Sequence, residues 1–157
     1  MALRRLGVIA LILLVIGSVV RSRPNLMDVS ADPSSALNGP MLPVPPRVMS
    51  TLRQACFDCH SDETRWPWYS LIPIASQLIE HDVTGGRAEL NWSHWLEYNA
   101  FDRADMLDKV CQLAANHTMP PRQYRMFHSA ARLSATDVSD LCDWTRLEGD
   151  RLVQDQR

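Results

Sequence analysis

The chain contains 157 residues, which is enough for one folded domain with additional segments at its ends. Residues 48–157 carry 16 acidic and 11 basic residues, and this net charge of −5 is poorly suited to nucleic acid, whose phosphates favour positive charge. No Gly-rich phosphate loop, Ser-His-Asp motif, internal repeat or run of strand period is present. We therefore expect an all-α protein without a nucleic-acid partner.

The N-terminal region begins with an uncharged, almost wholly apolar run over residues 6–20, flanked by Arg4, Arg5, Arg21 and Arg23. Such a run is the apolar part of a secretory signal or a short signal-anchor helix. No A-x-A-like cleavage site follows it, which favours an anchor that is retained. The sequence thus predicts a signal anchor or signal peptide over residues 1–23.

Six of the ten prolines lie in residues 24–46, which predicts a linker between the apolar run and the folded part of the chain. The alternative is that Met41, Leu42 and Val44 lie across the domain as a clasp. After Pro46 a short helix is expected, with Val48 on its buried face, and the folded domain covers residues 47–157.

The predicted helix runs directly into the sequence CFDCH at residues 56–60, which is the attachment signature of a c-type haem. The thiols of Cys56 and Cys59 are spaced to add to the two vinyl groups of one porphyrin. His60, which follows at once, then supplies the proximal iron ligand. A thioredoxin-like site, a zinc site or a plain disulfide fits less well, because no βαβ pattern and no second close Cys or His pair accompanies the motif.

Covalent haem and four cysteines downstream of the apolar run indicate an exported, oxidising compartment. We therefore expect the domain to face the periplasm or cell exterior, anchored to the cytoplasmic membrane by the N-terminal helix.

Ser70 is expected to cap a helix that runs to about Val83, with Ile74 and Leu78 in its buried stripe and the glycine pair at residues 85–86 ending it. Further helix starts are predicted at Ser93, Asp102 and, with Asp137 completing a capping box, at Ser134. Cys111 and Cys142 lie on apolar faces of the last two long helices. They form a disulfide or remain two small buried side chains.

Met119 precedes two prolines in the loop between these helices, and Pro120 favours extended backbone for it. A stiff loop can hold a thioether against a metal, whereas a methionine that fills a gap in the core is the ordinary alternative. Three histidines, His81, His117 and His128, are rival ligands.

The chain resembles a c-type cytochrome and, more narrowly, the haem-binding domain family of exported bacterial proteins, over roughly residues 48–146. Two positions depart from the pattern: Trp92 stands where we expect Phe, and Ser129 where we expect Pro. The matching residues, in chain order, are Cys56, Cys59, His60, Ser61, Pro67, Trp68, Tyr69, Ser70, His81, Gly86, Arg87, Leu90, Asn91, Ser93, Trp95, Met119, Pro120, Tyr124, His128, Ala131, Leu133, Ser134, Leu141 and Trp144.

The resemblance implies a cytochrome c-like bundle of short helices around one covalent haem c, with His60 as the proximal ligand. The loop of Met119 also resembles the ligand loop of many c-type cytochromes, so we predict Met119 as the sixth ligand. A thioether ligand raises the reduction potential, which suits an electron carrier.

From these features we expect a monohaem c-type cytochrome that carries electrons between redox protein partners and is not an enzyme. The alternative is a haem-based peroxidase or a gas or redox sensor with an open or weakly ligated distal site. A third reading is a membrane-tethered interaction module in which the haem is structural.

Overall fold

The computed structural model describes Gly7, Leu14 and residues 43–156. Residues 43–156 form helices and turns without a strand, which confirms the all-α prediction for this part of the chain. Its α-helices are joined by three short 3-10 helices, labelled η. The elements are α3 (Pro46–Ala55), α4 (Phe57–His60), η1 (Trp68–Leu71), α5 (Pro73–Glu89), η2 (Trp92–Glu97), α6 (Ala100–Ala115), α7 (Arg122–Phe127), η3 (Ser129–Ala131) and α8 (Ala135–Gln154).

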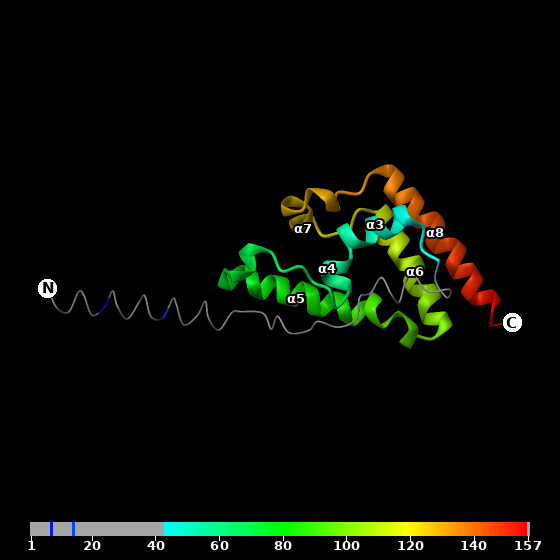
Figure 1. Ribbon diagram of the computed structural model, residues 1–157, viewed down its shortest axis with the longest axis horizontal. Coiled ribbons are helices and arrows are strands. Elements are labelled where there is room, and N and C mark those ends of the chain that lie inside the picture. The colour runs from blue at the N-terminus through cyan, green and yellow to red at the C-terminus, as the bar shows by residue number, and fades with distance from the viewer. Residues whose placement is uncertain (1–6, 8–13, 15–42, 157) are drawn as a thin grey trace.

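Helices α6 and α8 pack against each other and make the most extensive contact between any two of the described elements (Figure 1). A disulfide between Cys111 and Cys142 joins them across a sequence separation of 31 residues. Of the two possibilities for these cysteines, the structure therefore contains the disulfide. The helix before the motif, α3, also lies against α8, and α4 packs on α5.

The core lies where α3, η2, α6 and α8 meet. Trp92 and Trp95 are almost completely buried, and their rings are 5.2 Å apart. Leu52, Leu107 and Leu141, from three different helices, fill the space around these rings. Burying large aromatic and aliphatic side chains supplies most of the free energy that holds such a small helical domain together.

Helix starts are only partly as the sequence predicts. Ser134 and Asp137 form the expected capping box of α8, each side chain bonding to the other residue's backbone N–H. The other three predicted caps are wrong. Ser70 lies in η1, and α5 begins after Ile72 with Pro73 in its first turn and no side-chain cap. At the other two starts, the residue two or three positions earlier takes the role. Asn91 caps η2 through the backbone N–H of Ser93, and Asn99 caps α6 through that of Asp102.

Helix α5 differs most from the prediction. It continues through the glycine pair to Glu89 instead of ending near Val83. Its predicted buried stripe is also wrong, since Ile74 is 77% exposed and Leu78 60% exposed. The physical reason is that α5 faces the rest of the molecule through the side that bears Ser76 and Val83, both of which are buried.

The chain just before α3 is held against the last helix, because the indole Nε1 of Trp144 donates a hydrogen bond to the carbonyl oxygen of Pro43 (3.2 Å). Val44 also packs against the core. The predicted anchor or signal over residues 1–23 lies outside the described residues apart from Gly7 and Leu14, as do Met41, Leu42 and the linker over residues 24–42. Within the part that is described, no helix has the length and hydropathy needed to cross a bilayer.

Candidate haem-attachment site

The motif predicted to attach haem occupies the junction of two helices. Cys56 ends α3 and begins α4, and the amides of Cys59 and His60 both donate hydrogen bonds to its carbonyl oxygen. Residues three and four positions apart on a helical turn lie on the same side, so this turn brings the two thiols and the imidazole together. Both cysteines are free thiols.

A cavity of about 440 Å³ opens beside this turn. Its walls come from α4, the second half of α5, α6 and the loop before α7. Cys56, Cys59, His60 and Met119 all line it, so the cavity brings together the four residues predicted to bind the cofactor. Neither His81, His117 nor His128 is among the lining residues. The volume lies within the range of pockets that hold small molecules and cofactors in proteins.

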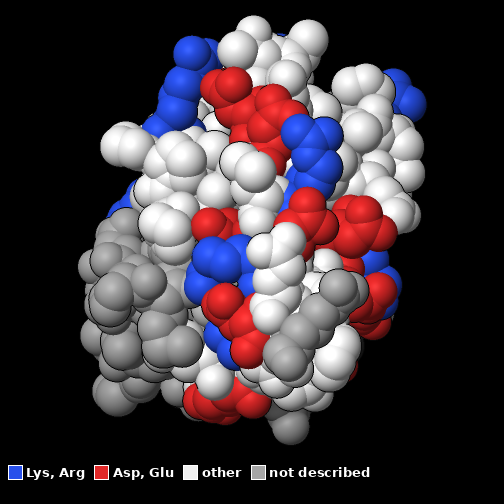
Figure 2. Space-filling view, turned by 90° about the vertical axis from the view of Figure 1, so that its right-hand side faces the viewer, with Lys and Arg blue, Asp and Glu red and all other residues white. Residues whose placement is uncertain are grey.

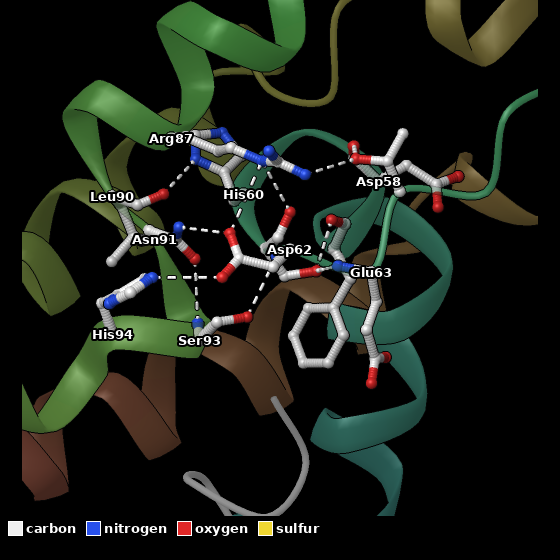
Figure 3. A network of polar contacts seen from close by, with 12 residues as sticks. Asp58, His60, Asp62, Glu63, Arg87, Leu90, Asn91, Ser93 and His94 are labelled. Atoms are coloured by element: carbon white, nitrogen blue, oxygen red, sulfur yellow. Dashed lines mark hydrogen bonds and ion pairs between the residues drawn. The ribbon is translucent and has the colours of Figure 1, made fainter. Parts of the chain in front are cut away.

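The orientation of His60 is fixed by one hydrogen bond. Its Nδ1 lies 3.0 Å from the carbonyl oxygen of Leu90 (Figure 3). Because a carbonyl only accepts, Nδ1 carries the proton and Nε2 keeps its lone pair. Burial lowers the pKa of His60, which favours the neutral imidazole. A neutral ring held through its second nitrogen is the usual state of a metal-binding histidine.

A network of polar contacts holds the Leu90 carbonyl in place. The carboxylate of Asp62 accepts a hydrogen bond from Asn91 Nδ2 at 2.8 Å and lies 3.1 Å from His94 Nε2 (Figure 3). The hydroxyl of Ser93 accepts from the amide of Asp62. These bonds tie the segment after His60 to the segment after Leu90. The donor and the acceptor of the His60 bond are therefore fixed relative to each other.

The close contact between α4 and α5 depends on Gly86. A Cβ added there would lie 2.5 Å from the carbonyl oxygen of Cys59, which no side chain tolerates without movement of the backbone. This contact explains why α5 continues through the glycine pair. Gly85 instead faces open space and lines the cavity.

Asp58, between the two cysteines, is buried and links the motif to distant segments. Its carboxylate accepts hydrogen bonds from Arg65 Nε (3.0 Å) and from the hydroxyl of Tyr124 (2.6 Å). Burial and the Asp58 carboxylate together raise the pKa of Tyr124. Tyr124 lies on α7, just after the loop of Met119, and lines the cavity. One carboxylate thus joins the attachment motif to the wall that carries Met119.

The state of the thiols argues against a thioredoxin-like reading of the motif. Burial raises the pKa of Cys56 to about 12, with Cys59 adding to the effect. The pKa of Cys59 is raised to about 11, again mainly by burial. Redox-active cysteine pairs need a lowered pKa, because the thiolate is the reactive form. No cluster of His, Cys, Asp and Glu that would bind a metal ion by itself occurs in the described part of the chain.

The residues around the cavity fit a porphyrin in two further respects. The indole N–H of Trp92 is buried and has no acceptor among the described residues, although Trp92 lines the cavity. A buried donor without an acceptor costs stability, and a ligand that brings carboxylates relieves that cost. The open space beside Gly85 would be filled by any side chain, so glycine there keeps room for a flat ring.

Sequence reasoning placed Gly86, Leu90 and Tyr124 among the residues that match the family pattern but did not find the contacts described here. Leu90 and Gly86 act through backbone atoms or through the lack of a side chain, and Tyr124 reaches Asp58 across 66 positions of sequence. The one available signal was the glycine inside a helical pattern, which often marks close packing.

Comparisons with known proteins give two sequence matches. A family model described as "Haem-binding domain" matches residues 12–147. In an alignment 103 residues long that covers 62% of this chain, the sequence is 28% identical to the protein named "Cytochrome c peroxidase Ccp" of Escherichia coli (strain K12). That match spans only 22% of the Escherichia coli protein. No solved structure matched.

Proposed function

This chain belongs to the haem-binding domain family, and from that premise we propose that it is a monohaem c-type cytochrome that transfers electrons. Cys56 and Cys59 would hold one haem c through thioether bonds, and His60 and Met119 would ligate its iron. The observation that carries the proposal is that all four residues line a single cavity. Haem bound there supplies one-electron chemistry between two iron states.

The protein residues hold and shield the group. His60 offers Nε2 because its Nδ1 is bonded to Leu90, and Met119 offers a thioether from the loop before α7. Trp92 Nε1 is the donor available for a propionate. Leu113 and Leu141 give the wall an apolar lining that excludes water.

For the whole chain we propose attachment to the cytoplasmic membrane through the apolar run at residues 6–20, with the domain in the periplasm or outside the cell. The proposed partners are redox proteins with a basic surface. Support comes from Asp82, Glu89, Asp102 and Asp105, whose carboxylates line the cavity with a single basic residue, Lys109. Opposite charge on a partner increases the rate of encounter.

The second candidate is a haem peroxidase or sensor. The likeness to a cytochrome c peroxidase favours it. In this case the sixth position is open or weakly ligated, and Met119, which is 37% exposed, moves aside. The two candidates therefore differ in the sixth ligand of the iron, which is Met119 in the electron carrier and an exchangeable small molecule in the peroxidase or sensor.

A pair of variants tests the attachment. Cys56→Ala/Cys59→Ala, made in an export-competent host, should lose all haem staining on a denaturing gel and show the mass of the polypeptide alone. Cys111→Ala/Cys142→Ala is the matched control and should keep covalent haem, because its cysteines lie in the disulfide. A colourless wild-type protein would refute the proposal.

The sixth ligand is tested by the absorption spectrum of the oxidised protein. The iron–sulfur charge-transfer band should be present in the wild type and absent in Met119→Ala. It should remain in Met126→Ala, since Met126 is exposed and lies outside the cavity lining. If the wild type lacks the band and binds carbon monoxide or peroxide readily, the enzyme or sensor candidate is correct and the carrier is not.

A further inference from the structure

One end of the domain carries an unusual number of exposed large apolar side chains. They belong to η1, the start of α5 and α7, which lie together at the left of Figure 1. Their exposed fractions range from 53% for Leu71 to 77% for Trp68 and Ile74. We call this surface the η1–α7 face, and it consists of Trp68, Leu71, Ile74, Leu78, Met126 and Phe127.

These side chains form one continuous surface. Ile74 and Leu78 are four residues apart and therefore share one side of α5, and Leu71 ends η1 just before this helix. The ring of Tyr69 joins η1 to α7, because its centroid lies 5.7 Å from that of Trp68 and 5.2 Å from that of Phe127. Monomeric soluble proteins rarely expose such a patch unless something binds to it.

The charge around the η1–α7 face differs from that of the rest of the domain. Residues 64–79 and 116–134 contain no Asp or Glu, although residues 48–157 carry a net charge of −5. Asp58 is buried and paired with Arg65, and the first carboxylates on α5 are those of Glu80 and Asp82, after Leu78. Arg122, Arg125 and Arg132 have no carboxylate within ion-pair distance among the described residues. The face is thus apolar with a basic surround.

The opposite end of the molecule gives the contrast. Figure 2 views the end at which α8 finishes, and there acidic and basic side chains alternate over the surface. A mixed surface of this kind is typical of solvated protein. In the described part of the chain, the η1–α7 face instead combines exposed Trp68 and Phe127 with nearby arginines that have no carboxylate within ion-pair distance.

We propose that the η1–α7 face rests on an anionic lipid bilayer. Trp68, Phe127 and the aliphatic stripe would enter the interface between headgroups and acyl chains, and the arginines would contact lipid phosphates. Aromatic rings favour that interface. A basic redox protein does not fit this face, because its charge has the same sign.

The proposal extends the membrane attachment proposed above. The residues between the apolar run and Pro43 reach at most about 73 Å, at about 3.3 Å per residue, so an anchored domain always lies near the bilayer. The stripe on α5 ends one turn before Asp82, which lines the cavity. The bilayer would therefore lie beside the cavity opening.

The test uses the full chain with haem in nanodiscs and carbene footprinting read by mass spectrometry. In discs that contain phosphatidylglycerol, labelling of Trp68, Ile74 and Phe127 should fall severalfold relative to the chain in detergent. Labelling of Leu147 on α8, which is 65% exposed, should not change. Discs of phosphatidylcholine alone should give weaker protection.

Variants make the test specific. Ile74→Glu should restore labelling of Trp68 and Phe127, whereas Leu147→Glu should not, and the haem spectrum reports that both are folded. Arg122→Gln should weaken protection in anionic discs, whereas Arg146→Gln on α8 should not.

Unchanged labelling of the face in an anchored chain overturns this proposal and leaves the anchor intact. Absence of the chain from the discs overturns both. Protection that depends on protein concentration, independently of lipid, would show a protein partner instead and also overturn it.

Discussion

Gly86 shows how one residue can determine the geometry of the attachment site. Gly86 packs against the carbonyl group of Cys59 so closely that there is no room for a Cβ atom. One helical turn later, the carbonyl oxygen of Leu90 accepts the hydrogen bond from His60. Any movement of α5 that makes room for a side chain at Gly86 also moves the Leu90 carbonyl. The position of the imidazole therefore depends on a residue with no side chain.

We predict that Gly86→Ala lowers the free energy of unfolding by about 1–3 kcal/mol, as overpacking usually does. It should also reduce the yield of covalent haem. The matched control is Gly149→Ala in α8, where the nearest atom to the added Cβ is 4.0 Å away. That variant should be neutral or gain up to about 1 kcal/mol from helix propensity. Denaturant unfolding and haem content per chain measure both effects, and equal results for the two variants would contradict the argument.

The same residues show what could be read from the sequence at this scale. Cys56, Cys59 and His60 are adjacent, so their spacing alone predicts an attachment motif. The partners of the motif are far away in sequence, since His60 bonds to a residue 30 positions on and Asp58 to one 66 positions on. Such pairs follow from the tertiary fold, which a single sequence does not show.

At the scale of elements, local signals predicted two helix starts, whereas single cap residues and the buried face of α5 were predicted wrongly. Proline at the start of α3 and the capping box of α8 act within one turn, and both helices begin where predicted. The apolar spacing of Ile74 and Leu78 correctly indicates a helix, but periodicity does not reveal which face is covered. Helix α7 was missed, because its six residues have no apolar period and none of them is buried.

The α6–α8 pair leads to a prediction about the disulfide. Closing a loop of 31 residues restricts the unfolded chain, which in the chain-entropy model is worth about 3–4 kcal/mol. Cys111→Ser/Cys142→Ser should therefore unfold at a lower denaturant concentration and keep its haem. Dithiothreitol should lower the stability of the wild type to the same level, since it reduces disulfides and leaves thioethers intact. A further loss when the reagent is added to the variant would show that another bond is involved.

At the scale of the whole molecule, the chain has a packed part and a hollow part. Leu52, Leu107 and Trp144 belong to the apolar core shared by α3, α6 and α8. The cavity lies on the other side of α6, between it and α5. We expect the packed part to fold without cofactor and the hollow part to depend on it, because a ligand that binds only the native state stabilises what it touches.

Amide hydrogen exchange of Cys56→Ala/Cys59→Ala, which cannot attach haem, tests whether the packed part folds without cofactor and the hollow part does not. Exchange should become faster in the second half of α5 and in the Met119 loop, whereas amides of α8 should keep most of their protection. Wild-type protein with haem is the reference, and Met126→Ala with haem controls for a surface change. Uniformly faster exchange along the chain would show that the domain folds as one unit around its cofactor.

The approach of Cys59 to Gly86 also limits how the site can be transplanted. A protein engineer who grafts the five residues CFDCH onto a foreign helix obtains two thiols and an imidazole, but no second helix close enough to orient the ring. A graft would need the segment from Cys56 through Asn91, because this segment includes both Gly86, which packs against Cys59, and Leu90, which accepts the hydrogen bond from His60. A shorter peptide lacks the carbonyl acceptor that orients the imidazole of His60.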